Sequence, residues 1–526
     1  MLHATLSAGQ VHLIPRFRYR IWLVGALLLA LQLFFLTRPG IEEDEALFVG
    51  PFIGTAPSLY EWHVGHFRIP VMAMDYIGAL KSWLYWPVFR LWTPNVWSIR
   101  LPVCLLSVVT LLLFADVVRR AAGSRVALAA AVFLATDAVF VLINVFDMTV
   151  CLLLLGTVAF LNLLQRFEES GKQMFLGAAF LVAGLALWYK AIFIFPLAAM
   201  LLALAVAYPG QVWRRFTLRN VALAAIGIVV GAAPLIAFNW ERRGATVQAS
   251  GALPSVPALE KLVMLQHTLD GRAFEHYMFR STPAEKIPLT GASSGELAIR
   301  WYRESHFGPG SALLPALVLA LVALPFLRGS AQFPALLFSW FAMAAAYGAM
   351  FVFRDAGAGP HHTVMLYPAP HFIVAASAAA LAERYLRGKR TAAFLAFCIV
   401  LVASNAWLLG RYAHAARANG FSVYWSDGVE RLAEVLGHQN LPVAVLDWGI
   451  PNGVQIDAHD TLTFADPAPR ENVLYVTHCD GYVIDESQTA QFRAQLASSA
   501  LRVKANRVVA DKKGHLVYCL FQLERN

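Results

Sequence analysis

The sequence predicts an α-helical polytopic membrane protein with about eleven transmembrane helices, followed by a small soluble C-terminal α/β domain. Three observations predict this class. Of 526 residues, 58% are hydrophobic and only 14% are charged, whereas a soluble domain is roughly one-quarter charged. The apolar residues gather into runs that approach the roughly 20 residues needed to cross a bilayer. After residue 410 the composition changes, and short helix-like and strand-like pieces alternate.

The apolar runs extend over the first 410 residues, which we expect to form one transmembrane domain. Two long segments without a spanning run, 39–98 and 240–310, are predicted to be external loops. The runs cover 21–38, 99–118, 126–143, 148–165, 174–189, 191–208, 220–239, 311–327, 333–352, 364–382 and 391–409.

The basic residues predict the orientation of the chain. With the N-terminus inside, every predicted inner loop carries at least one Lys or Arg, as the positive-inside rule requires. The net charge of +9 therefore reflects topology and does not indicate nucleic-acid binding. The absence of an Asn-x-Ser/Thr sequon and of a retention signal favours a bacterial membrane. We expect a multi-pass protein of the cell inner membrane with a cytoplasmic N-terminus and a periplasmic C-terminal domain.

Four consecutive acids follow the first run, within residues 41–48. Carboxylates at a membrane boundary need water, a cation or a chemical role. For Glu42 and Glu43 we expect simple solvation at the helix end. Asp44 and Glu45 are candidate catalytic residues.

The first external loop, 39–98, mixes aromatic and apolar residues with scattered charges, which is typical of helices lying in the membrane interface. Within 70–92, Asp75 and Lys81 stand in a mainly apolar segment. A charge in such a place faces a polar cavity or extends toward the lipid headgroups. We interpret Lys81 as a functional cation, with extension to the headgroups as the alternative.

Two further charges lie on the same predicted side of the membrane. Asp147 precedes the fourth run, where a carboxylate can simply face the helix dipole. Alternatively, it shares a site with Asp44, because paired carboxylates suit acid–base chemistry or recognition of substrate hydroxyls. Lys190, in the next outer turn, is either an interfacial anchor beside Trp188 and Tyr189 or part of the same site.

The loop 240–310 contains several basic residues and prolines and is typical of a lid or binding loop. Arg354 lies on the same side, and His361 and His362 precede the tenth run. Adjacent histidines rarely chelate a metal without a third ligand. No ligand set is evident, and a divalent cation stays an open alternative.

Residues 411–526 are predicted to form the external α/β domain. Cys479 and Cys519 can form a disulfide there if the compartment is oxidising. No nucleotide-binding fingerprint is present. The expected helices are 428–437 and 491–501, the expected strands 443–446 and 473–477, and the expected closing hairpin 502–510 and 515–523.

The order of these features resembles the GT-C glycosyltransferases that use polyprenyl-phosphate sugars, the superfamily of protein O-mannosyltransferases and lipid A aminoarabinose transferases. Asp44-Glu45 is similar to the acidic motif of their first external loop. Residues 78–85 look like their lysine segment, which meets the donor phosphate, and residues 144–148 look like their second acidic motif. Residues 185–190 are similar to their LxxLTKG motif, and residues 361–370 resemble the RYxLPxxP segment before a late span.

The resemblance implies transfer of a sugar from a polyprenyl-phosphate donor to a hydroxyl of a lipid, glycan or protein on the outer face, with inversion. Asp44 would be the catalytic base and Glu45 its helper. Asp147, Asp75 and Tyr76 would orient the substrate. The cations expected to bind the donor phosphate are Lys81, Lys190, Arg354, His361 and His362.

The alternative function is a membrane transporter or flippase for a lipid-linked or anionic substrate, in which intramembrane charges mark an ion path. The predicted charges instead cluster at one face, and neither paired broken helices nor repeated halves are evident. The arrangement of Asp44, Lys81, Asp147 and Lys190 discriminates the two. Convergence in one outward-facing site supports the transferase, whereas a path at mid-depth supports transport.

Overall fold

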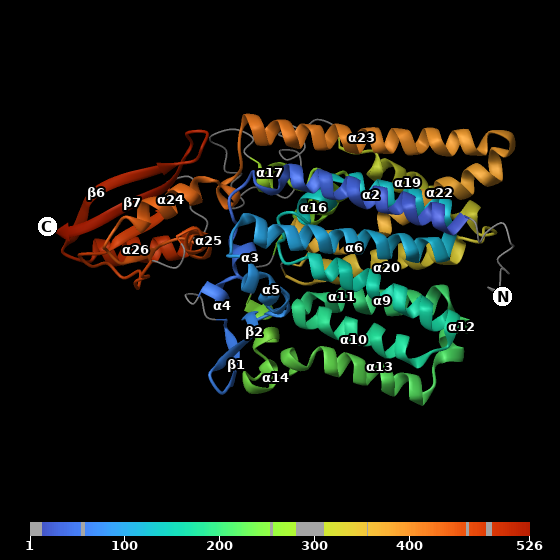
Figure 1. The fold of residues 1–526 in the computed structure, drawn as a ribbon, viewed down its shortest axis with the longest axis horizontal. Helices are drawn as coiled ribbons and strands as arrows, with labels where there is room; N and C mark the ends of the chain where they lie inside the picture. Colours follow the sequence, from blue (N-terminus) through green and yellow to red (C-terminus); the bar gives the residue numbers. More distant parts are fainter. Residues whose placement is uncertain are drawn as a thin grey trace.

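A computed structural model describes residues 13–53, 58–252, 256–279, 310–354, 356–458, 462–479 and 486–526. Most of the described chain forms a bundle of helices that run roughly side by side, and a small sheet region lies at one end of that bundle (Figure 1). The predicted fold class is therefore confirmed.

The helices of the bundle follow the apolar runs of the sequence. Their bounds are α2 (Leu13–Leu36), α6 (Val96–Ala122), α7 (Ser124–Thr136), α8 (Ala138–Ile143), α9 (Cys151–Ser170), α10 (Gln173–Tyr189), α11 (Ile194–Ala207), α12 (Pro209–Arg215), α13 (Leu218–Gly231), α14 (Ala233–Glu241), α19 (Leu313–Ala323), α20 (Phe333–Val352), α22 (Ala369–Tyr385) and α23 (Arg390–Ala418).

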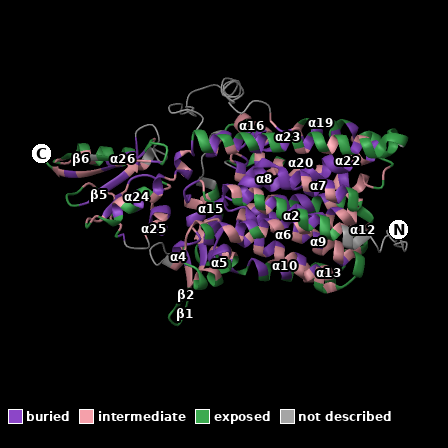
Figure 2. Cartoon of the chain, turned by 45° about the horizontal axis from the view of Figure 1, so that its top comes forward, coloured by how far each residue is buried: buried purple, intermediate pink, exposed green. Residues whose placement is uncertain are grey.

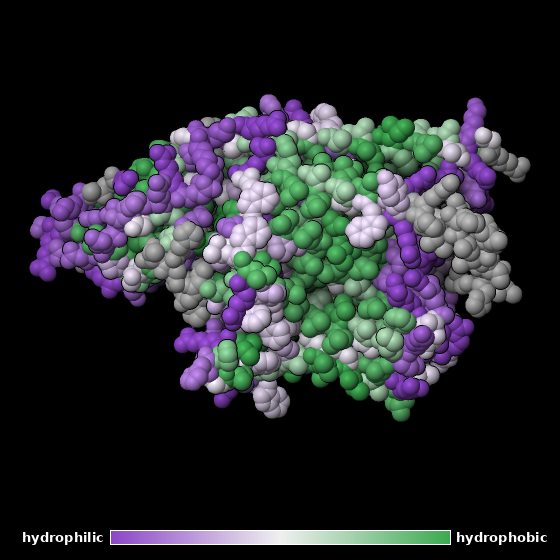
Figure 3. All heavy atoms as spheres, in the orientation of Figure 1, coloured by the Kyte–Doolittle hydropathy of each residue, from purple (hydrophilic) through white to green (hydrophobic). Residues whose placement is uncertain are grey.

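Within the described ranges, six helices are long and apolar enough to span a membrane, or up to eight if each of two bent pairs counts as one span. Three further apolar helices are shorter. Each predicted run coincides with one of these helices or pairs, so the runs located the helices correctly. Hydrophobic residues cover the middle of the bundle, and hydrophilic residues gather at its two ends (Figure 3). The interior is closely packed around buried side chains such as Leu28, Phe133 and Ile373 (Figure 2).

The first external loop differs from the prediction, because residues 60–78 form an antiparallel sheet instead of interfacial helices. Its strands are β1 (Tyr60–Val64), β2 (Phe67–Met74) and β3 (Ile77–Gly78), in that order. Gly65 has φ +59°, as a tight two-residue hairpin turn requires. Along the chain, the helices α3 (Glu43–Ala46) and α4 (Gly50–Ile53) precede this sheet, and the helix α5 (Leu80–Leu91) follows it.

The second external loop contains three short helices, α15 (Ala245–Ala252), α16 (Ala258–Leu269) and α17 (Glu275–Met278). Its residues 280–309 lie outside the described ranges, so the predicted lid stays a prediction. A fourth short helix, α21 (Pro360–Thr363), leads into α22.

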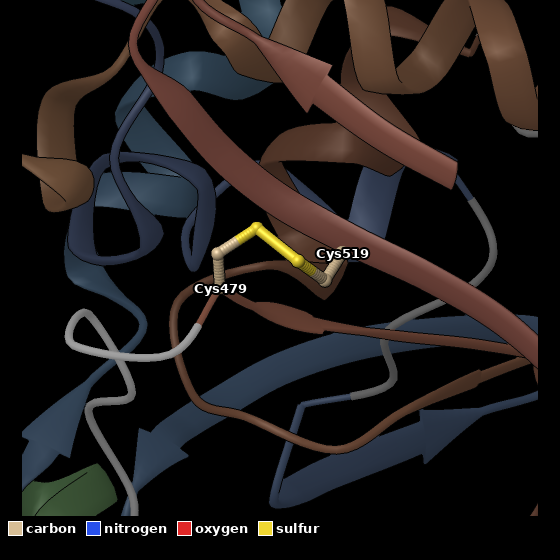
Figure 4. The surroundings of a disulfide bond; sticks show 2 residues. All are labelled: Cys479 and Cys519. Carbon is tan, nitrogen blue, oxygen red and sulfur yellow. A yellow bond between two sulfur atoms is a disulfide. The ribbon is translucent and has the colours of Figure 1, made fainter. Parts of the chain in front are cut away.

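The C-terminal region is a four-stranded sheet of order β4-β5-β7-β6, in which β4 and β5 are parallel and the other pairs antiparallel. The predicted strands and hairpin are confirmed, while the second predicted helix begins earlier, at Glu486. A disulfide joins Cys479 to Cys519, with their Cα atoms 5.0 Å apart (Figure 4). The elements are η5 (Val423–Trp425), α24 (Gly428–Gly437), β4 (Val443–Val445), α25 (Pro451–Asp457), β5 (Leu474–His478), α26 (Glu486–Ala497), β6 (Leu501–Ala510) and β7 (Leu516–Arg525).

The C-terminal region is joined closely to α3. The backbone N–H of Gly40 donates to the carbonyl of Trp425 at 3.0 Å. A Cβ at position 40 would lie 2.2 Å from the carbonyl oxygen of Ser426, so only glycine fits there. The side-chain amide of Asn452, on α25, donates to Glu43 at 2.6 Å. The acidic stretch is therefore held between the bundle and the C-terminal sheet.

Candidate active site

Four of the predicted charges come from four separate segments of the chain, of which α3 and α5 lie at the end of the bundle next to the C-terminal sheet (Figure 1). Asp44 lies on α3 and Lys81 on α5, in the first external loop. Asp147 lies between α8 and α9, and Lys190 follows the end of α10. Asp147 and Lys190 therefore lie at helix ends. Asp44 and Lys81 lie on short helices of the first external loop.

Lys81 and Asp147 form a buried ion pair. The Nζ of Lys81 lies 2.8 Å from Oδ2 of Asp147, and each side chain is only 2% exposed. The other oxygen of Asp147 accepts from the backbone N–H groups of Val150 and Cys151 at 2.7 and 2.9 Å. Asp147 thus binds the backbone at the start of α9 as well as Lys81. Because Lys81 is buried, the alternative in which it extends to the headgroups is wrong.

Lys190 is placed by its neighbours on both sides. Its Nζ donates to the hydroxyl of Thr149. Its backbone forms a bridge with Ile77 of β3, and the next N–H, of Ala191, donates to the carbonyl of Tyr76 at 3.0 Å. The small sheet of the first external loop therefore holds the end of α10 in position.

Thr149 adopts a backbone conformation that β-branched residues seldom adopt. Its φ is +60°, in the left-handed region. Such a conformation costs on the order of 1–3 kcal/mol and persists only where the surroundings impose it. Here it directs a buried hydroxyl at Lys190, two residues after Asp147.

Asp44 interacts with all three of these charges. It is half-buried on the single turn of α3, and its carboxylate lies within electrostatic reach of Lys190, Asp147 and Lys81. The pKa of Asp44 is raised, chiefly by burial; the two lysines oppose the shift and Asp147 adds to it. A carboxylate with a raised pKa is the better proton acceptor, as a general base requires.

Glu45 is occupied by an ion pair that the sequence did not predict. Arg100, on α6, donates from Nε and Nη2 to the two carboxylate oxygens of Glu45 at 2.6 and 2.7 Å, and both residues are buried. Since both oxygens are bound, we assign Glu45 a positioning role in place of the predicted catalytic one. Arg100 begins a predicted span, and a charge in that place is a signal that sequence reasoning can use.

The expectation that Glu42 and Glu43 are simply solvated is wrong. Glu42 is buried and caps α3: its carboxylate accepts from the N–H of Asp44 at 2.8 Å, and its own N–H donates to Glu45. Glu43 binds Asn452 of the C-terminal region. Burial raises the pKa of Glu43 to about 8, although the hydrogen bonds from Asn452 lower it.

Of the remaining predicted residues, Tyr76 and His361 lie near Lys190. Asp75 and Tyr76 form the half-buried turn between β2 and β3, beside Lys190 through the Tyr76 carbonyl. His361 and His362 lie on α21 with ring centroids 4.1 Å apart, and the charge of Lys190 reaches His361. Arg354 is exposed just beyond α20.

Lys261, on α16, is a second cation that the sequence did not single out. It is buried, and its Nζ donates to the carbonyls of Phe351 at 3.2 Å and of Phe353 at the end of α20. It therefore ties the second external loop to the segment that carries Arg354. Within the described ranges, no group of three or more His, Cys, Asp or Glu residues is arranged to hold a metal ion.

The family model for dolichyl-phosphate-mannose-protein mannosyltransferases matches residues 79–238. That range contains Lys81, Asp147 and Lys190. No curated protein matches the sequence significantly.

Several solved structures share the fold. ArnT from Cupriavidus metallidurans, bound to undecaprenyl phosphate, aligns with a TM-score of 0.56 at 13% identity, covering 95% of this chain and 97% of ArnT. The Archaeoglobus fulgidus oligosaccharyltransferase in complex with Zn and sulfate aligns with a TM-score of 0.52 at 12% identity, covering 95% of this chain and 72% of that one. AglB from the same organism, in complex with an inhibitory peptide and a dolichol-phosphate, aligns with a TM-score of 0.51 at 11% identity, covering 97% and 74%.

At such identities the likeness establishes the fold. The family model matches residues 79–238 alone, whereas the structural alignment with ArnT covers 95% of the chain. The resemblance seen in the sequence is confirmed: the chain is a multi-pass membrane protein with the fold of the GT-C glycosyltransferase superfamily.

Proposed function

We propose that the protein is an inverting membrane glycosyltransferase that moves a sugar from a polyprenyl-phosphate donor to an acceptor hydroxyl, with Asp44 as the base. One observation carries the proposal: Asp44, Lys81, Asp147 and Lys190 come together at one end of the bundle. Sugar transfer from a phosphate needs a proton acceptor and cations in one site, and this group supplies both.

The position of the group favours a lipid-linked donor. The hydrophobic middle of the bundle ends near α3 and α5, where hydrophilic residues begin (Figure 3). A phosphate with an isoprenoid tail lies at this level of a bilayer. The ligands of two structural neighbours, undecaprenyl phosphate for ArnT and a dolichol-phosphate for AglB, are of the same chemical kind.

In the proposed reaction the acceptor oxygen attacks the anomeric carbon while Asp44 takes the hydroxyl proton. The bond between that carbon and the phosphate oxygen breaks, and the polyprenyl phosphate leaves with the electron pair. Lys81 and Lys190 stabilise the charge that develops on the phosphate. A single displacement inverts the anomeric carbon.

Asp147 acts in this scheme mainly through Lys81. The ion pair of 2.8 Å holds the ammonium group in place, and the N–H groups of α9 hold the carboxylate. Tyr76 and Asp75 are assigned to the same side of the site as Lys190. Arg354, His361 and His362 are further candidate contacts for the donor phosphate.

We further propose that residues 1–410 and 411–526 are separate domains, although α23 continues to Ala418. The C-terminal domain is assigned to the periplasm and the N-terminus to the cytoplasm of an inner membrane. The disulfide between Cys479 and Cys519 supports an oxidising compartment for the C-terminal domain. Membrane lipids are partners on this scheme, and nucleic acid is not.

The transporter alternative receives less support, because α3 and α5, which carry Asp44 and Lys81, lie at one end of the bundle (Figure 1), and Asp147 and Lys190 interact with these two residues. The test is to supply the purified protein in lipid nanodiscs with a panel of polyprenyl-phosphate sugars. We expect consumption of one sugar donor and release of its polyprenyl phosphate. Failure to consume any of them, together with translocation of a lipid-linked substrate in vesicles, would overturn the proposal.

A further inference from the structure

A cluster of aromatic side chains lies where the C-terminal region meets the bundle. Tyr277, on α17, stacks on Tyr424 of η5, with ring centroids 5.9 Å apart and an interplanar angle of 11°. Tyr424 in turn meets Trp448 edge-to-face at 6.1 Å. Trp448 lies between β4 and α25 and is 40% exposed, and the two tyrosines are half-buried. The cluster therefore keeps ring surface available to a ligand.

The cluster is fixed relative to α3. The carbonyl of Tyr277 accepts from the hydroxyl of Ser422 at 3.0 Å, which ties α17 to the C-terminal region. Trp425, next to Tyr424, accepts from the N–H of Gly40 at 3.0 Å, and Asn452 binds Glu43. These contacts hold the aromatic rings beside the helix that carries Asp44.

Carboxylates border the cluster. Burial raises the pKa of Tyr277, and the charges of Glu42 and Asp44 add to the shift. Burial also raises the pKa of Tyr424, with contributions from Asp447 and Glu42. Asp44 thus interacts both with the two lysines and with this aromatic, acidic group.

This combination suits a sugar ring. The apolar C–H face of a pyranose packs against an aromatic ring, and its hydroxyls bond to carboxylates and phenols. Tyr277 and Tyr424 are only half-buried and Trp448 is 40% exposed, so parts of these side chains face outward from the cluster. Acidic groups lie on this side, with Asp447 already held by His478 at 2.7 Å, so an anionic ring would meet negative charge and an uncharged or an amino sugar fits better.

We propose that Tyr277, Tyr424 and Trp448 form the acceptor subsite, and that the acceptor hydroxyl belongs to an uncharged or amino sugar instead of a protein side chain. The proposal rests on the proposed transferase function. A free glycan and the head of a glycolipid present the same chemistry, and the test separates them.

Binding is measured first, because it does not require turnover. In the Asp44→Asn variant, we expect methyl glucoside or methyl glucosaminide to change the tryptophan fluorescence in a saturable way, and methyl glucuronide to bind more weakly. Trp448→Ala should weaken glycoside binding roughly ten-fold or more, the loss expected for about 1.4 kcal/mol of contact. Tyr424→Phe keeps the ring and should have a smaller effect. The control is Trp213→Ala, which removes a tryptophan that is 81% exposed at the opposite end of the bundle.

Turnover then separates the two proposals. Donor consumption with water alone tests the transferase. With a glycoside, Trp448→Ala should raise the acceptor KM roughly ten-fold while the donor KM stays unchanged. Faster turnover of a lipid-linked glycan than of the free glycan identifies a glycolipid head. Three results would overturn the acceptor subsite and leave the transferase intact. They are donor hydrolysis without glycoside binding, an unchanged acceptor KM in Trp448→Ala, and transfer to a Ser/Thr peptide in preference to every glycoside.

Discussion

Arg100 holds Glu45 through two hydrogen bonds of 2.6 and 2.7 Å, and neither side chain reaches solvent. The same guanidinium donates to the carbonyls of Leu36, Pro39 and Gly40 at 2.6–3.0 Å. It therefore closes the end of α2 and fixes the residue next to Asp44. The position of the proposed base therefore depends on this charge pair.

We expect Arg100→Met to leave Glu45 buried and unpaired. Breaking such a pair typically costs about 3–5 kcal/mol, so the melting temperature in detergent should fall clearly. The matched control is the double variant Arg100→Met with Glu45→Gln, which removes the unpaired charge and should regain part of that stability. Equal melting temperatures for Arg100→Met and the native protein would contradict this account.

Lys81→Met should impair both stability and transfer, because it leaves the Asp147 carboxylate buried without its cation. In the double variant Lys81→Met with Asp147→Asn, the asparagine still accepts from the N–H groups of α9. We expect this variant to recover most of the lost stability while transfer stays at least about 100-fold below native, because the phosphate has lost a cation. Unfolding curves and donor consumption are measured side by side. Recovery of transfer along with stability would show that Lys81 is only structural.

Glu43 makes the stability of the protein depend on pH. Burial raises its pKa from an ordinary value of 4.5 to about 8. Between these values the unfolded state ionises while the folded state stays protonated, so the folded state loses stability as the pH rises through this window. Glu43→Gln, which still accepts from Asn452, should remove this contribution. Melting temperatures between pH 4.5 and 8.5 should fall less steeply in the variant, and parallel curves would contradict the prediction.

The disulfide provides a test of topology. If the C-terminal domain is periplasmic, a membrane-impermeant maleimide applied to intact spheroplasts should label Cys479 and Cys519 only after reduction. The free cysteines Cys104, Cys151 and Cys398 lie in the bundle and are the internal comparison. Labelling of the pair only after lysis would place the domain in the cytoplasm and contradict the proposed orientation.

Much of the fold could be predicted because apolar runs and turn residues act locally. Each predicted run contains a helix, and the strands of the hairpin around Asp511 lie within two residues of their expected bounds. The sheet at residues 60–78 was missed because aromatic and apolar residues suit an interfacial helix as well as a strand. Its strands are specified by pairing with each other and by the contact of Gly78 with the end of α10, where a Cβ would lie 2.1 Å from the carbonyl oxygen of Trp188.

The charged residues of the candidate site were found because they interrupt apolar sequence, but their pairing was not evident. Lys81 and Asp147 are 66 positions apart, and nothing local indicates that they touch. Glu42 and Glu43 seemed equivalent to their neighbours, yet one caps α3 and the other binds Asn452. Contacts between residues so distant in sequence depend on how the helices pack.

The most direct test of the central claim is the transfer rate of Asp44→Asn, measured with the sugar donor that the native protein consumes. Loss of a general base typically slows a reaction about 10²–10⁴-fold. We predict a loss in this range, with native melting temperature and native donor binding, and inversion of the anomeric carbon in the residual product. A rate within a few-fold of native, or a product with retained configuration, would contradict the assignment of Asp44 as the base.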